Sequence, residues 1–432
     1  MAMIYSRKLA LACVITLTLA VPLRTAVRAQ APKGDEGEIV VPSGEFKSDD
    51  KVLAQRFHDG KQMSDSDKPA LQRVAKWYIY RLTLSKYQDR TPDQNEPLSS
   101  ARSVNDLLQE LFALLVLPNP NKAIQLSPNQ QRYMQEFTSA LIPPIERVLQ
   151  NNKQIARINA AIVLAKLGES GNEAVVKPLL AILKDKNQND AVKLWALIGL
   201  KNLFRAKSNP DVEGFKDRDE EVDYIHELLE FLARKPSLPP NATDEEREAF
   251  RYVRREAIRA LGQTRYPALL KKKVPLGRPA LELVRIMRND GISPEPTFSE
   301  QIEAAIGVCQ MKAKLYPNYQ LEYAIQQVGQ FLLDFADKYE KERNKPNKSA
   351  SWKYESARLQ QALSTLAEDA PQQERAKVAS FAQVAKDMLK RIENNSESLV
   401  VELRKWLDKN QPPENALYKG EKDATIKSEA TE

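Results

Sequence analysis

One stripe of residues returns along the middle of the chain and restricts the folds that are open to it. In its first copy Arg157, Ala160, Leu164 and Leu167 are spaced three, four and three residues apart, so they share one face of a helix. Later copies begin 36, 97 and 144 residues downstream, with the members Lys193, Ala196, Leu200 and Leu203; Arg254, Ala257 and Leu261; and Gln301, Ala304, Val308 and Met311. A small alanine lets a neighbouring helix approach, and the larger apolar residues fill the seam beside it. The stripe therefore predicts helices that stack side by side.

A second apolar helix is expected before each stripe helix. Its members are Ile145, Val148 and Leu149; Leu179, Leu180, Ile182 and Leu183; and Leu228, Leu229, Phe231 and Leu232. Pro144, Pro178 and Pro279 stand in register in three of these helices, which predicts a bend or a helix start at the same place in each unit. Two-helix units that recur at a period of roughly 40 residues are typical of a stacked α-solenoid, in which each unit covers the apolar face of its neighbour.

The best-defined unit resembles a known family. Residues 157–168, reading RINAAIVLAKLG, and residues 173–183, reading EAVVKPLLAIL, resemble a HEAT repeat, and residues 254–262, reading RREAIRALG, resemble its second helix. The resemblance implies an all-α fold in the form of a HEAT-type α-α superhelix, or solenoid. It also implies a curved binding scaffold and no particular chemistry.

The remaining chain is predicted to be helical or flexible. Only 14 of 432 residues are glycine, and Ala, Leu, Lys, Glu, Gln and Arg recur in every long segment, which favours helix with almost no sheet. We expect the following order: a flexible linker at 30–50, an N-terminal helical segment at 51–120, HEAT-type repeats at 121–316, a C-terminal helical bundle at 317–410 and a disordered tail at 411–432. An intermolecular coiled coil is the alternative for the C-terminal helices.

The first 29 residues have the pattern of a secretory signal peptide. Arg7 and Lys8 precede an apolar stretch at 9–21, and Val27-Arg28-Ala29 fits a cleavage site. The stretch is too short to span a bilayer, which takes about 20 residues. We therefore expect an exported protein, periplasmic or secreted, from a bacterial host. Loss of the signal lowers the formal net charge from +7 to +3, so charge gives no support for a nucleic-acid partner.

The residues that usually carry chemistry are scarce. The chain has two histidines, His58 and His226, and Cys309 is the one thiol left after signal removal, which excludes a zinc cluster of histidines and cysteines. No glycine-rich phosphate loop occurs. The acidic run at 217–223 fits a helix start. We predict no catalytic, cofactor-binding or metal-binding residues, and a scaffold that binds another protein; the alternatives are an enzyme or lyase that holds a ligand on the same scaffold, and a structural component of the cell envelope.

One segment is a candidate docking surface. The segment from residue 247 to residue 278 contains ten basic residues and two acidic ones, Glu248 and Glu256. The candidate residues are Arg247, Arg251, Arg254, Arg255 and Arg259. Four of them recur every fourth residue and form a slanting stripe on a helix. The stripe is either a solvated face whose charges are balanced by carboxylates of neighbouring repeats, or a docking surface for an acidic protein or polymer.

The signal pattern predicts cleavage between Ala29 and Gln30. Intact-mass measurement of the exported protein is expected to give a chain that begins at Gln30, because signal peptidase reads the small residues at 27 and 29. Recovery of the full-length N-terminus from a membrane fraction would contradict the prediction.

Overall fold

The computed structural model describes residues 37–42, 44–88, 103–115, 126–209, 212–234, 238, 241–345 and 351–421. The predicted signal peptide at 1–29 and its predicted cleavage site lie outside these residues. Sixteen α-helices form most of the described chain. The prediction of a mainly helical chain is confirmed.

The helices have the following bounds. They are α2 (Ser48–His58), α3 (Lys68–Arg81), α4 (Ser85–Gln88), α5 (Val104–Ala113), α6 (Pro128–Leu149), α7 (Gln154–Gly168), α8 (Val176–Lys184), α9 (Asp190–Lys207), α10 (Arg218–Ala233), α11 (Asp244–Thr264), α12 (Pro279–Arg288), α13 (Phe298–Cys309), α14 (Leu321–Glu342), α15 (Trp352–Asp369), α16 (Arg375–Glu393) and α17 (Val401–Lys409).

Local sequence explains where many of these helices begin. Thr243 and Thr297 each accept a hydrogen bond from the backbone N–H three residues later, and a glutamate at that later position reaches back to the threonine N–H. This reciprocal capping box satisfies backbone groups that a helix start otherwise leaves unpaired. Asn189 and Asp217 cap α9 and α10 with their side-chain oxygens. At these four helices the residue type at the cap marks the helix start.

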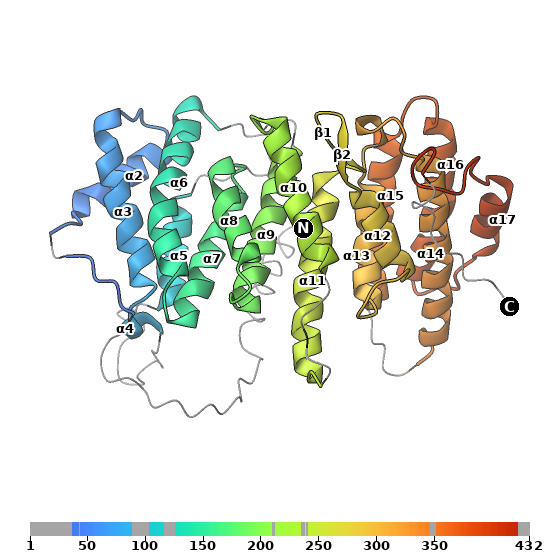
Figure 1. Cartoon of the computed structure of the whole chain (residues 1–432), viewed down its shortest axis with the longest axis horizontal. Helices are drawn as coiled ribbons and strands as arrows, with labels where there is room; N and C mark the ends of the chain where they lie inside the picture. Colours follow the sequence, from blue (N-terminus) through green and yellow to red (C-terminus); the bar gives the residue numbers. More distant parts are fainter. Residues whose placement is uncertain are drawn as a thin grey trace, which may run out of the picture. The chain divides into compact units, whose positions relative to one another are not determined.

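The middle of the chain forms two layers of helices. Helices α7, α9, α11, α13 and α15 pack in that order, each against the next, and we call them the odd layer. Helices α8, α10, α12 and α14 pack in order beside them and form the even layer. Figure 1 shows the helices following one another in chain order from α2 and α3 at one side to α17 at the other.

The predicted stripe marks the contacts within the odd layer. Its four alanines are fully buried, and so are nearly all of its larger apolar members. At two crossings the backbones come closer still. A methyl group on Gly262 of α11 would lie 2.8 Å from the Cα of Gly307 on α13, and one on Gly168 of α7 would lie 2.5 Å from the carbonyl oxygen of Gly199 on α9. Only glycine fits at such a contact.

The three prolines in register do not act alike. Pro279 lies in the first turn of α12, and Pro178 is the third residue of α8. Pro144 lies inside α6, next to Pro143. The first two mark helix starts, where a missing N–H removes no helical hydrogen bond. The prediction that the three prolines have the same role was therefore wrong.

Parts of the predicted linker at 30–50 belong to the fold. Helix α2 begins at Ser48, inside the linker. The Ile39 N–H donates to Thr83, the Gly37 carbonyl accepts from Asn151, and both carboxylate oxygens of Asp50 accept from Arg73. Ile39 and Phe46 also pack against the core, and the Phe46 ring stacks on Trp77 at a centroid distance of 4.7 Å. These contacts come from single residues, so the segment has no apolar periodicity for a sequence search to find.

The C-terminal helices lie within the range 317–410 predicted for a helical bundle, but α14 and α15 continue the two layers. Helix α14 packs against α12 and α15 packs against α13, while α16 and α17 pack on α14 and α15 or on each other. Part of the predicted tail at 411–432 is also packed: Leu417 and Tyr418 are fully buried. That part of the tail prediction was wrong.

A short β-hairpin interrupts the helices between α11 and α12. Its strands are β1 (Leu269–Lys271) and β2 (Val274–Gly277), which pair antiparallel and contact α10. Lys272 and Lys273 form the turn with φ of 50° and 70°, a conformation that turns between paired strands require. Among the described helices, none is long and apolar enough to cross a membrane.

Replacement of Gly262 by alanine is expected to lower the free energy of unfolding by about 1–3 kcal/mol, because the added methyl group forces α11 and α13 apart. Gly214→Ala is the matched control, since nothing lies within 4 Å of a methyl group there. Urea denaturation of the two variants measures the difference. Equal midpoints would contradict the close crossing.

Candidate functional site

The arginine stripe of α11 does not form one surface. Arg254, one of the five candidate residues, is only 5% exposed. Its Nε lies 2.6 Å from Oε1 of Glu300 and its Nη2 lies 3.0 Å from Oε2, and Nη1 donates to the Pro294 carbonyl. Because Glu300 also accepts from Thr297 at the start of α13, the pair ties α11 to the next helix. Arg254 therefore belongs to the core and is not available to a partner.

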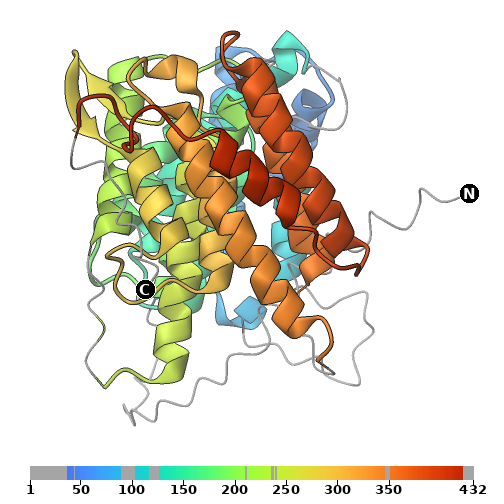
Figure 2. The same ribbon diagram turned by 90° about the vertical axis from the view of Figure 1, so that its right-hand side faces the viewer.

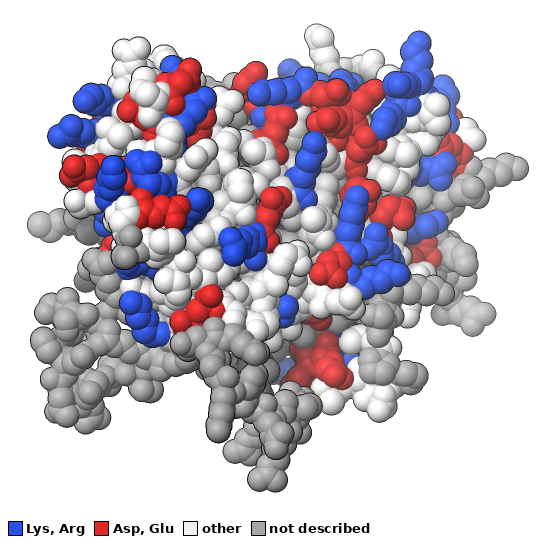
Figure 3. Space-filling view, turned by 60° about the vertical axis from the view of Figure 1, so that its left-hand side comes forward, with Lys and Arg blue, Asp and Glu red and all other residues white. Residues whose placement is uncertain are grey.

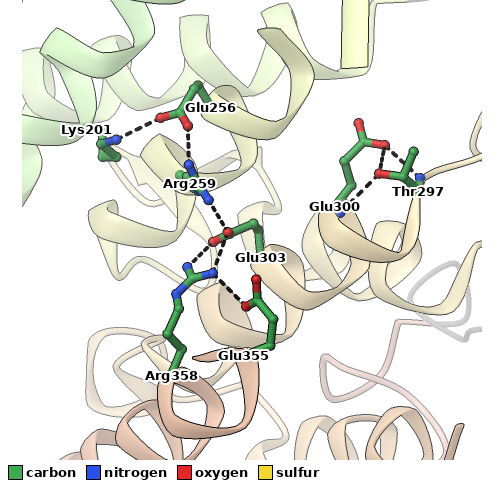
Figure 4. A network of polar contacts seen from close by, with 8 residues as sticks. All are labelled: Lys201, Glu256, Arg259, Thr297, Glu300, Glu303, Glu355 and Arg358. Carbon is green, nitrogen blue, oxygen red and sulfur yellow. Dashed lines mark hydrogen bonds and ion pairs between the residues drawn. The ribbon is translucent and has the colours of Figure 1, made fainter. Parts of the chain in front are cut away.

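Arg259 belongs to a charge network across four helices, shown in Figure 4. The network runs from α9 to α15 through Lys201, Glu256, Arg259, Glu303, Arg358 and Glu355. Lys201 Nζ lies 2.7 Å from Glu256, and Arg259 bonds both Glu256 and Glu303. Both terminal guanidinium nitrogens of Arg358 donate to the Glu303 carboxylate, at 2.5 and 2.8 Å. Positive and negative groups alternate, so the network leaves no net charge for a partner.

The two central carboxylates of this network stay ionised although they are buried. Burial alone would raise the pKa of Glu303, but Arg358 and Arg259 more than offset it, and the pKa lies below its usual value. The pKa of Glu256 is lowered in the same way, with Lys201 and Arg259 outweighing burial. Each carboxylate has two cationic partners, as a buried charge requires.

The other three arginines of the stripe differ in what they contact. Arg247 donates to the Ala242 carbonyl near the start of α11, and Arg251 forms an ion pair with Glu248 one turn away. The guanidinium of Arg255 lies 4.6 Å from the centre of the Tyr252 ring. No carboxylate within the described ranges pairs with Arg255. Of the five candidates, Arg247 and Arg255 are the two without a carboxylate partner in the described residues; Arg247 is exposed near the start of α11, and Arg255 lies beside Tyr252.

The exposed face of the odd layer carries apolar side chains. Ile155 on α7, Tyr252 on α11 and Tyr354 on α15 are 46%, 42% and 58% exposed. Half-buried apolar residues lie with them on α7 and α9: Ile158, Ile162, Leu194, Trp195 and Ile198. On α7 the spacing 155, 158, 162 places three isoleucines on the face opposite the buried stripe. Large apolar residues gathered on one free face are a feature of binding surfaces.

Cations without a carboxylate partner border these apolar residues. Arg255 on α11 is one, and Arg205 on α9 is another, whose guanidinium has Asn202 as its hydrogen-bond partner at 3.5 Å. Elsewhere the surface is mixed in sign: Figure 3 shows acidic and basic side chains interspersed over the face that it draws. The odd-layer face thus combines apolar contact area with a small excess of positive charge.

The histidines and the cysteine lie apart from this face. His58 ends α2 and bonds Asp59 at 2.8 Å, and His226 lies on α10. Cys309 is buried, and burial raises the pKa of its thiol to about 12, so it stays protonated. In the acidic run Asp217 caps α10, Glu221 accepts from Tyr266, and Asp223 pairs with Lys271. No group of acidic, histidine and cysteine side chains in the described part of the chain is placed to hold a metal ion.

Comparison of the chain with known protein families, with curated proteins and with solved structures gave no match. The site is therefore described from its own geometry.

Pairing with carboxylates of neighbouring repeats, one of the two alternatives for the arginine stripe, occurs for Arg254 and Arg259. Sequence reasoning did not name the carboxylates themselves. A signal was present: Glu256 and Glu303 each stand directly before the stripe alanine, at Ala257 and Ala304. In the first copy the same position holds Asn159, which is also buried. A polar residue repeated beside the most buried position of a unit indicates a pairing between units. Lys201 and Arg358 carried no comparable signal, because their roles depend on which helices become neighbours.

Glu303→Gln is expected to lower the free energy of unfolding at neutral pH by about 3 kcal/mol or more, because it leaves Arg259 and Arg358 without their shared anion. Glu355→Gln, the matched control on the exposed side of the network, should cost about 1 kcal/mol or less.

The same pair of variants tests the lowered pKa of Glu303. Its ionised form stabilises the fold fully above the unfolded pKa of about 4.3, and this stabilisation is lost as the pH falls through the folded value. The difference between wild type and Glu303→Gln in urea denaturation should therefore shrink below about pH 4. A difference that does not change with pH would contradict an ionised Glu303.

Proposed function

We propose that the chain is an exported HEAT-type α-solenoid scaffold that binds another protein through the exposed face of its odd layer, with no catalysis of its own. The observation that carries the proposal is the set of apolar side chains on that face. In a stack of helix pairs each layer is covered on one side by the other layer, and the remaining face is free. Solenoids use that face for binding.

The chemistry of the face supports a partner with both apolar and acidic groups. Tyr252 and Tyr354 offer large rigid contact areas that lose little entropy on binding, as aromatic residues do at the centres of interfaces. Arg255 above Tyr252 can receive a carboxylate without giving up a partner of its own. The acidic partner inferred from the arginine stripe is therefore retained, with Arg255 in place of the whole stripe.

Export and a bacterial origin remain inferences from the first 29 residues, and they direct the choice of experiment. Mature protein immobilised on a resin is to be incubated with envelope extract from its own host, and the bound proteins identified by mass spectrometry at low and at high salt.

The double variant Ile155→Ser, Tyr252→Ser is expected to lose at least about nine-tenths of the specific partner, since truncation of central aromatic residues commonly costs 2 kcal/mol or more. The matched control is Leu399→Ser, Val401→Ser, which removes two apolar residues of similar exposure, 45% and 54%, at the start of α17. Arg255→Ala should weaken capture mainly at low salt. Equal capture of the partner by both double variants would show that the partner binds elsewhere, and would contradict the proposal that it binds the odd-layer face.

A further inference from the structure

The chain after α17 returns to a groove that lies far away in the sequence. In Figure 2 the dark red segment after α17 runs back towards the yellow β1–β2 hairpin. We call residues 416–421 the latch. Leu417 and Tyr418 of the latch are fully buried, while Lys419 and Gly420 and the preceding residues 413–415 are exposed. The latch is therefore anchored by two side chains between exposed flanks.

Main-chain hydrogen bonds hold the latch through one isolated antiparallel bridge. The Gln320 N–H donates to the Leu417 carbonyl at 2.8 Å, and the Lys419 N–H donates to the Asn318 carbonyl at 2.9 Å. These bonds flank an antiparallel bridge between Tyr319 and Tyr418. Strand addition of this kind is a common way for a protein to bind an extended peptide.

Side chains of three separate segments form the groove around Tyr418. Its hydroxyl donates to the Pro267 carbonyl at 2.6 Å, and its ring lies against Tyr316 and Tyr319 at centroid distances of 5.7 and 6.1 Å. Arg278 lies 5.9 Å from the ring centre and forms an ion pair of 2.7 Å with Glu421. The groove thus binds a tyrosine, the residue before it and a carboxylate three residues after it.

The odd-layer and even-layer helices do not depend on the latch for their contacts. The groove wall comes from the base of the hairpin, the start of α12 and the connection between α13 and α14, and each of these is joined to a helix packed in its own layer. Release of the latch breaks the two main-chain bonds, the hydrogen bond from the Tyr418 hydroxyl to Pro267 and the ion pair between Arg278 and Glu421. It uncovers the rings packed around Tyr418, which is a local opening and leaves the layers in place.

We propose that this groove is a peptide-binding site for an extended segment with an aliphatic–tyrosine pair followed by a carboxylate, and that the latch is its built-in occupant. A segment of this chemistry on another protein binds in the groove after the latch has left it. The site is separate from the odd-layer face, so it stands or falls independently of the proposed function.

The test uses the full chain and a fluorescent peptide of residues 412–421. Wild-type protein should bind the peptide weakly, because the latch occupies the groove and only the open fraction is competent. Tyr418→Ala, which removes the anchor from the latch but leaves the groove intact, should bind it about tenfold or more tightly. The control peptide with alanine in place of its tyrosine should bind neither protein. Circular dichroism and thermal melting verify that the variant keeps its helices.

A second variant and a measurement on the unmodified chain guard against loss of structure in Tyr418→Ala. Glu421→Arg opposes Arg278 and leaves both anchors in place, so peptide affinity should rise by a smaller factor. In hydrogen exchange of the wild type, the latch should exchange well before α13. Equal peptide affinity in wild type and a folded Tyr418→Ala, no binding to that variant, or exchange of the latch together with α13 would each overturn the proposal.

Discussion

Close contact between neighbouring helices of the odd layer is the constraint on which the other features depend. Each of α9, α11 and α13 has a neighbour on both sides in its own layer and an even-layer helix behind it. Three sides are therefore filled by protein, and the side chains there must be small or apolar, or paired if they are charged. The fully buried alanines and the contact between Gly262 and Gly307 meet the first requirement. The one remaining side of each helix is free to carry function.

The charge network meets the second requirement and decides which arginines remain available. Glu256 and Glu303 lie in the seams between helices, and each needs two cations to compensate its burial. Arg259 and Arg358 are paired in this way, and Arg254 is paired with Glu300. A buried pair of this kind stabilises little compared with an apolar contact of the same size, but a shift of one helix along its neighbour separates the charges. The network therefore favours one register between helices. Arg247 and Arg255 are the stripe arginines that lack a carboxylate partner in the described residues.

Sequence reasoning worked wherever one helix carried the whole signal. The stripe positions, the apolar helices expected before them and the helix start at the acidic run 217–223 all predicted helices that occur. It failed where a short segment meets a distant one. The latch is an example: Leu417 and Tyr418 are two apolar residues in a polar stretch, and nothing near them indicates that Pro267, more than a hundred residues earlier, accepts the tyrosine hydroxyl. Helix α2 lies mostly within the predicted helical segment at 51–120, and only its first three residues were assigned to the linker.

The sequence by itself determined the secondary structure, the repeated unit and the residues that line its buried seam, because these follow from spacing along one chain segment and from the size of single side chains. Only the tertiary structure decided which charges are free, which face is exposed and where the end of the chain lies. Each of those depends on the identity of a neighbour that is distant in sequence. The sequence pattern around an arginine on a helix does not show which group will lie beside it. Arg259 lies beside Glu303, a carboxylate of the next helix, whereas Arg255 lies beside Tyr252, an aromatic ring of its own helix.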